Sequence, residues 1–330
     1  MGTARLGIVR SPEVAEAIPE LVRRGWIAPE RAAPRLRAAR GDLASARGEL
    51  RALLYLSVLL LVAGVSLLVK ENLERIGPLG IASGLGLAAL ACLAWTLRRS
   101  PEFSWQRAVS ADWSFDYLLL LGILLAGLEL AYVEAKFTPL GEHWRHHLLL
   151  LTGLTAGLAL RCDSRLAWSL ALSTFAAWRG LATARLMGDL MQERGDLRWN
   201  LLTVGAVFVG LGLALRRFDR KAHFEPLTTW LGAALVLVGL GLGSFADGGW
   251  GRLWALALLG AAVATALVAL RYRRFAHFAL GALGAYAAAS RLMVELLRDP
   301  LGGCFWFAAS SVAMILLLVF VQRRFRAESE

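Results

Sequence analysis

The segment from residue 114 to residue 151, SFDYLLLLGILLAGLELAYVEAKFTPLGEHWRHHLLLL, combines a long apolar run with a few ionisable residues. The run from 115 to 133 is close to the ~20 residues that a helix needs to cross a bilayer. One acid, Glu129, lies inside that run, and a turn with three histidines follows it. Ionisable side chains are costly at membrane depth, so Glu129 is the first candidate for a functional group.

The rest of the chain repeats this pattern of apolar runs separated by clusters of charge. Apolar residues make up 57% of the 330 residues, and the mean hydropathy is +0.56. These values are typical of a multi-helix membrane protein. The net charge of +11 comes almost entirely from arginines at the ends of apolar runs, where they contact anionic lipid headgroups. The pattern therefore favours a lipid bilayer over nucleic acid as the partner.

Ten apolar runs predict an all-α integral membrane protein with about ten transmembrane helices. The runs cover residues 52–69, 79–97, 115–133, 148–160, 166–178, 200–215, 227–245, 253–270, 275–290 and 303–321. Two of them, 148–160 and 166–178, are short for a full crossing, and re-entrant segments are the alternative. Flanking aromatic and basic residues extend both runs, so we expect full crossings.

The distribution of lysine and arginine predicts that both termini are cytoplasmic. With this orientation, about two thirds of the 36 basic residues fall in cytoplasmic segments, as the positive-inside rule requires. The arginines of the loop 180–199 are the exception. Together with the Ala-, Leu- and Arg-rich composition, this orientation indicates a multi-pass protein of a bacterial inner membrane.

Residues 1–51 form a charged segment that lacks the apolar stretch of a signal peptide. Ser11-Pro12-Glu13 is typical of a helix start, and a second helix is expected from Pro29 onward. We expect a small helical region in the cytoplasm. Residues 10–45 would pack against each other, the membrane surface or a cytoplasmic protein partner.

Sequence matches indicate that the membrane region is duplicated. Ala159-Leu160-Arg161 recurs as Ala269-Leu270-Arg271, and the segment 184–191 (ARLMGDLM) resembles the segment 290–297 (SRLMVELL). The matches predict two copies of a four-helix unit, residues 114–217 and 226–324, preceded by two helices in residues 52–99. An even number of crossings gives both copies the same orientation. Chance is the alternative, because Ala, Leu and Arg are common in this chain.

Glu129 and Arg179 are candidates for an ion pair inside the first copy. Counting 1.5 Å per residue from the cytoplasmic ends of their helices places both at about the same height. The aligned positions of the second copy, Gly239 and Ala285, are both uncharged, as expected if the two charges compensate each other. The alternatives are two side chains that reach the interface independently, a structural pair, and a solute- or proton-linked site.

Three histidines of the turn after this helix form a candidate metal or interface cluster. His143 and His147 lie four residues apart, so they share one helix face, and His146 is beside them. Zinc uses such spacing, but a catalytic site needs a third ligand, for which Glu134 or Glu142 is available. The alternative is an ordinary turn at the membrane interface that binds no metal. Cys92, Cys162 and Cys304 form no metal-binding motif, and we expect no cofactor.

Several segments resemble one family of bacterial membrane proteins. The resemblance rests on Leu21-Val22-Arg23-Arg24-Gly25-Trp26-Ile27-Ala28-Pro29-Glu30-Arg31-Ala32, on Gly64–Asn72 with the turn Ile76-Gly77-Pro78, and on Phe115–Gly122. These segments resemble bacterial membrane proteins classed by domain of unknown function 2157, and the resemblance covers roughly residues 15–180. The resemblance implies a polytopic inner-membrane protein with a cytoplasmic helical N-terminus, and it transfers no catalytic or binding residue.

Three hypotheses for the function follow from these observations. The first is a non-catalytic binding or scaffolding protein of the envelope. The second is a transporter of a small solute or ion, with its site between the two four-helix repeats near Glu129. The third is a membrane enzyme acting on lipid-linked substrates, for which Glu71 in an outside loop is a candidate acid. Because no nucleophile, nucleotide-binding or paired-aspartate motif is present, the sequence leans away from an enzyme.

Overall fold

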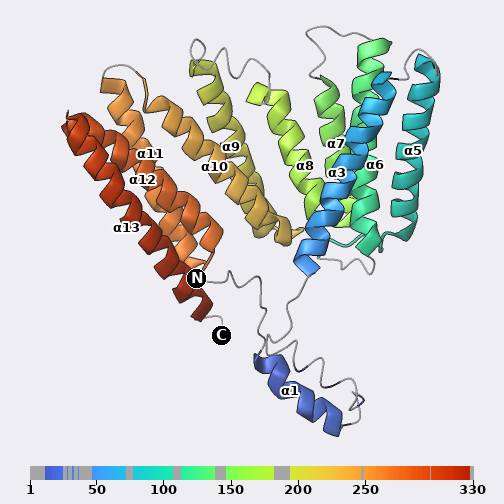
Figure 1. The fold of residues 1–330 in the computed structure, drawn as a ribbon, viewed down its shortest axis with the longest axis horizontal. Helices are drawn as coiled ribbons and strands as arrows, with labels where there is room; N and C mark the ends of the chain where they lie inside the picture. The colour runs from blue at the N-terminus through green and yellow to red at the C-terminus, as the bar shows by residue number, and fades with distance from the viewer. Residues whose placement is uncertain are drawn as a thin grey trace. The chain divides into compact units, whose positions relative to one another are not determined.

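The computed structural model describes residues 12–24, 28, 32, 36, 47–71, 77–106, 113–137, 146–181, 194–246, 249–297 and 299–327. Every regular element in these ranges is a helix (Figure 1). The α-helices are α1 (Pro12–Arg23), α3 (Arg47–Glu71), α5 (Pro78–Arg99), α6 (Trp113–Lys136), α7 (His146–Cys162), α8 (Arg165–Ala176), α9 (Arg194–Arg217), α10 (Glu225–Gly243), α11 (Gly249–Arg271), α12 (Phe275–Leu297) and α13 (Pro300–Ala327). A π-helical turn, η2 (Ala177–Leu181), continues α8, and a 3-10 turn, η4 (Ala222–Phe224), precedes α10. The chain divides into two compact units, residues 1–61 with 323–330 and residues 62–322.

Seven helices in the described ranges are long and apolar enough to cross a membrane: α5, α6, α9, α10 with η4, α11, α12 and α13. The other three predicted runs also fold as helices. α7 has 17 residues, and α8 with its π-helical continuation spans residues 165–181, about 26 Å each at 1.5 Å per residue. α3 contains a shorter apolar stretch, Leu53–Leu67. The prediction of an all-helical multi-pass membrane protein is confirmed.

The first unit contains α1, which begins at Pro12 in the predicted helix start and is amphipathic. Ile18 is buried, while Glu20 pairs with Arg23 at 2.5 Å and with Arg24 at 3.0 Å on the polar side. The helix ends at Arg23. The predicted second helix of this region lies outside the described residues, apart from single positions.

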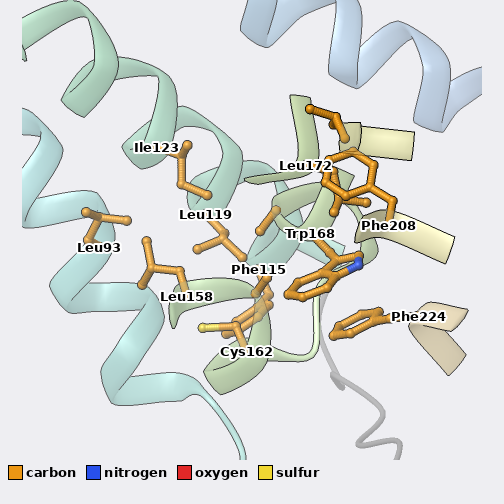
Figure 2. Packing of buried hydrophobic residues seen from close by; sticks show 13 residues of the cluster. Leu93, Phe115, Leu119, Ile123, Leu158, Cys162, Trp168, Leu172, Phe208 and Phe224 are labelled. Carbon is orange, nitrogen blue, oxygen red and sulfur yellow. The ribbon is translucent and has the colours of Figure 1, made fainter. Parts of the chain in front are cut away.

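In the second unit, one apolar cluster joins α5, α6, α7, α8, α9 and η4. Figure 2 shows Trp168 of α8 lying flat against Phe224, with ring centroids 5.2 Å apart and an angle of 6° between the rings. The indole nitrogen of Trp168 donates a hydrogen bond of 2.8 Å to the hydroxyl of Thr228 in α10. Buried indoles need such an acceptor, so this bond fixes α8 against the start of α10.

Glycines allow two helix pairs to approach closely, α9 with α10 and α11 with α12. A Cβ atom on Gly232 would lie 2.7 Å from the backbone nitrogen of Val209, and one on Gly281 would lie 2.6 Å from that of Ala266. Gly239 and Gly243 also face neighbouring side chains, whereas a Cβ on Gly241 would meet nothing within 4 Å. The Gly239–Gly243 segment is therefore a helix-packing surface at two of its three glycines.

The turns between α7 and α8 and between α11 and α12 share one backbone geometry. Asp163 and Arg273 both have left-handed conformations, with φ of 58° and 53°. In each turn the following residue donates to the carbonyl five positions back: Ser164 to Ala159 at 3.3 Å, and Arg274 to Ala269 at 2.9 Å. Asp219, after α9, has the same geometry, with φ of 50° and a bond of 3.1 Å from Arg220 to the carbonyl of Leu215. This turn is therefore a recurrent way for the described helices to end and is not specific to the repeat.

Candidate functional site

Glu129 lies on the face of α6 that packs against α5. A Cβ atom placed on Gly86 of α5 would be 3.7 Å from Glu129 Oε1. Glu129 Oε2 and the hydroxyl of Tyr132 are both buried, and neither has a hydrogen-bond partner among the described residues. Positions three apart share a helix face. α6 therefore carries two polar groups with unused hydrogen-bonding capacity on the side toward α5.

Arg179 is not brought to Glu129 in the structure. Its guanidinium donates a hydrogen bond of 2.9 Å to Asn200 Oδ1 and lies 5.8 Å from the ring centroid of Trp178. Within the described residues, no ion pair joins the two charges. The two residues were matched by height and by the uncharged aligned positions of the second copy. In the fold Glu129 faces α5, whereas Arg179 lies in η2 and contacts α9.

The histidine cluster is described only in part. His143 and Glu142 lie outside the described residues, and His146 begins α7 with an exposed side chain. Nδ1 of His147 lies 3.4 Å from Oε2 of Glu134 near the end of α6, so one of the two acids suggested as a further ligand is adjacent to a histidine. In the part of the chain that is described, no three His, Cys, Asp or Glu residues are arranged to hold a metal ion.

A deeply buried ionic cluster lies where α7 turns into α8 and α9 turns into α10. Lys221 Nζ lies 3.0 Å from Asp163 Oδ1, and these side chains are 1% and 2% exposed. His223 Nε2 lies 2.7 Å from the same carboxylate oxygen. Burying a charge is costly unless it is paired. The cluster therefore ties together two helix connections that are about 58 residues apart in sequence.

The segment 101–106 covers this cluster through backbone contacts. The amide of Lys221 donates to the carbonyl of Trp105 at 2.7 Å, and Arg161 donates to the carbonyl of Pro101 at 2.6 Å. Nζ of Lys221 lies 5.5 Å from the ring centroid of Phe103, within cation–π range. Three connections between helices are thus held at one end of the second unit.

A second pair at this end of the unit joins α10 to the turn before α12. Arg274 Nη1 and Nη2 donate to the two carboxylate oxygens of Glu225 at 2.6 and 2.5 Å, and Glu225 is buried. Hydrogen bonding to the Glu225 carboxylate raises the pKa of Arg274, so the guanidinium remains charged. Such two-point contacts are among the strongest in proteins.

A cavity of ≈ 300 Å³ adjoins the ionic cluster. It is lined by Arg165, Leu166, Ser169, His223, Pro226 and Leu227. Although His223 and Ser169 both line it, the Ser169 hydroxyl donates to the carbonyl of Leu166 at 2.7 Å. His223 is paired with the Asp163 carboxylate and not with the Ser169 hydroxyl. The geometry therefore fits a structural role for His223 better than a role as the base that activates Ser169 as a nucleophile.

The Asp163–Lys221 pair was not predicted from the sequence. Lys221 is one of only three lysines in an arginine-rich chain, and Asp163 lies in a short turn between two apolar runs. The two unusual residues were detectable in principle. Their pairing was not, because it depends on how the two turns meet in space.

Residues 19–168 match the family model described as Predicted membrane protein (DUF2157). The resemblance expected from the sequence is confirmed over this range. The DUF2157 region contains Glu129 and Asp163, whereas Arg179, Lys221 and His223 follow it. No curated protein and no solved structure matches the chain.

Proposed function

We propose that the chain is a non-catalytic binding or scaffolding protein of the bacterial inner membrane. The observation that carries this proposal is that the buried charges are paired with each other: Asp163 with Lys221, and Glu225 with Arg274. The first pair joins two helix connections, and the second joins the start of α10 to the turn before α12. Neither pair leaves a charge free for substrate chemistry. The apolar helix contacts at glycines also favour a stable, closely packed helix bundle.

The proposal includes ten crossings with both termini in the cytoplasm, and a duplicated membrane region. Gly122 and Gly232, which are 110 residues apart as Ala159 and Ala269 are, support the duplication. A Cβ atom on Gly122 would lie 2.8 Å from Leu93 of α5, and one on Gly232 would lie 2.7 Å from Val209 of α9. Each glycine therefore packs on the preceding helix. These contacts also fit repeated units α5–α8 and α9–α12, an alternative to residues 114–217 and 226–324 that begins one helix earlier.

A cytoplasmic protein partner of residues 10–45 completes the scaffolding proposal. The exposed residue Ala17 of α1 is the position to test, by in-cell crosslinking from a photoreactive residue. We expect one discrete protein adduct at this position. Leu213 of α9, an exposed apolar residue of a candidate span, is the control and should give lipid adducts only. Identical adducts at both positions would contradict the proposal.

A transporter is the second candidate, and the observation that favours it is Glu129. Its buried Oε2 has no hydrogen-bond partner among the described residues, and membrane-embedded acids often mark ion pathways. The two described cavities are lined by other residues. If the protein is a scaffold, the proton flux into proteoliposomes that contain it should equal the flux into empty liposomes. A flux above background that Glu129→Gln abolishes, and that the exposed control Glu102→Gln retains, would favour the transporter.

Replacing Glu129 by leucine is expected to stabilise the protein by about 1–3 kcal/mol, the cost of a buried polar group without a partner. The change is measurable as the free energy of unfolding in mixed detergent–SDS micelles. Glu102→Leu, at an exposed position outside the helices, should leave this free energy unchanged. A destabilised Glu129→Leu protein would show that the carboxyl makes a favourable interaction in the membrane.

A further inference from the structure

An open cavity of ≈ 660 Å³ lies at the far end of the second unit's last helices, away from the ionic cluster. It is formed where α10 ends, α11 begins and α12 ends, and its lining includes Phe245, Gly249, Arg252, Arg291, Val294 and Glu295. Its volume is in the range of small-molecule sites. None of these residues takes part in the pairs described above.

Two arginines and one acid supply the polar wall of the cavity. Arg252 Nε lies 2.5 Å from Glu295 Oε1, and Arg291 Nη1 lies 3.4 Å from Glu295 Oε2. Arg291 is also held by a bond of 3.2 Å from its Nε to the carbonyl of Ser244. Arg252 is 62% exposed, and Arg291 and Glu295 are about one third exposed. The acid therefore orients both guanidinium groups while the cavity remains accessible.

The recorded bonds leave donors available on both arginines. A guanidinium has five N–H donors and no acceptor. Among the described residues, Arg252 uses only its Nε and Arg291 uses its Nε and Nη1. Within the described part of the chain, the terminal nitrogens of Arg252 and Nη2 of Arg291 are thus available to bind an anion. One negative charge would neutralise the net +1 charge of Arg252, Arg291 and Glu295.

We propose that this cavity binds a phosphate group, carried by an anionic lipid or by free phosphate. Arginine pairs match the planar, two-point geometry of phosphate oxygens. The large apolar side chains of Phe245, Trp250 and Leu296 are exposed in the same segments, and they provide surface for acyl chains. A lipid headgroup and free phosphate share the recognised chemistry. The site is independent of the partner of α1 and is tested separately.

The test uses the purified full chain in mixed micelles of detergent and phosphatidylcholine. Phosphatidylglycerol or inorganic phosphate is titrated in, and binding is followed by the thermal shift of tryptophan fluorescence. We expect phosphatidylglycerol to raise the Tm of the native protein. Arg252→Gln and Arg291→Gln should each weaken this binding about tenfold, the effect of losing one charge-assisted hydrogen bond. Competition by inorganic phosphate at similar concentrations would identify the free anion as the source.

Glu295→Gln separates ligand binding from a structural role of the same cluster. If the arginines bind phosphate, removal of the competing carboxylate strengthens phosphatidylglycerol binding, opposite to the arginine variants. If the cluster only holds α11 to α12, all three variants lower the Tm and none changes the affinity. Arg271→Gln, on an exposed residue at the other end of α11, is the matched control. Equal loss of binding in that control, or no binding by the native protein, would overturn the proposal.

Discussion

Replacing Lys221 by methionine is expected to lower the free energy of unfolding by about 3–5 kcal/mol, the cost of breaking a buried ion pair. Methionine fills most of the volume of the lysine, so the loss comes from the Asp163 carboxylate, which is left in a site that is 2% exposed. Unfolding in mixed detergent–SDS micelles measures the effect, and the amount of monodisperse protein after extraction should fall in parallel. Lys136→Met, at the exposed end of α6, is the control and should change little.

A double variant distinguishes a broken pair from a damaged turn. Lys221→Met with Asp163→Asn removes both charges, and asparagine tolerates the left-handed conformation at position 163. We expect the double variant to recover much of the stability lost in Lys221→Met, because neutral replacement of both partners is far less costly than removal of one. Losses that simply add would show that the two side chains act independently.

Helix positions were predictable from the sequence because the apolar runs encode them directly. The runs 79–97, 115–133 and 275–290 lie within α5, α6 and α12, since a bilayer requires long apolar segments whatever the tertiary fold. The direction in which each side chain points around its helix was harder to predict from the sequence. Glu129 and Arg179 were matched by height, but height does not determine the rotation of a helix about its axis, which decides the neighbour that each side chain meets.

Polar contacts between distant turns were the least predictable part of the fold. Asp163, Lys221 and His223 come from separate connections, and their identities resemble the scattered charges that set membrane topology. Only the packing of Trp168 on Phe224 and the closure of the two turns bring them together. Glycines were similarly ambiguous: Gly239 and Gly241 have the same local sequence setting, yet only Gly239 meets a neighbouring helix.

Replacing Gly232 by valine is expected to separate α9 from α10 and to destabilise the protein by about 3 kcal/mol or more, the upper range for overpacking. The new Cβ would lie 2.7 Å from the backbone nitrogen of Val209 and 2.8 Å from the carbonyl oxygen of Gly205. Backbone atoms cannot move aside as a flexible side chain can, so the helices themselves have to shift.

Gly241→Val provides the matched control on the same helix. It changes helix propensity by the same amount, but a Cβ at position 241 meets nothing within 4 Å. The difference between the two variants in free energy of unfolding therefore isolates the contact between α9 and α10. Because Gly122 contacts α5 as Gly232 contacts α9, Gly122→Val should also destabilise. Its loss should be smaller, since the nearest atom is the end of the Leu93 side chain. Equal stability of Gly232→Val and Gly241→Val would exclude the close α9–α10 packing, and with it the α5–α8 and α9–α12 frame of the repeat.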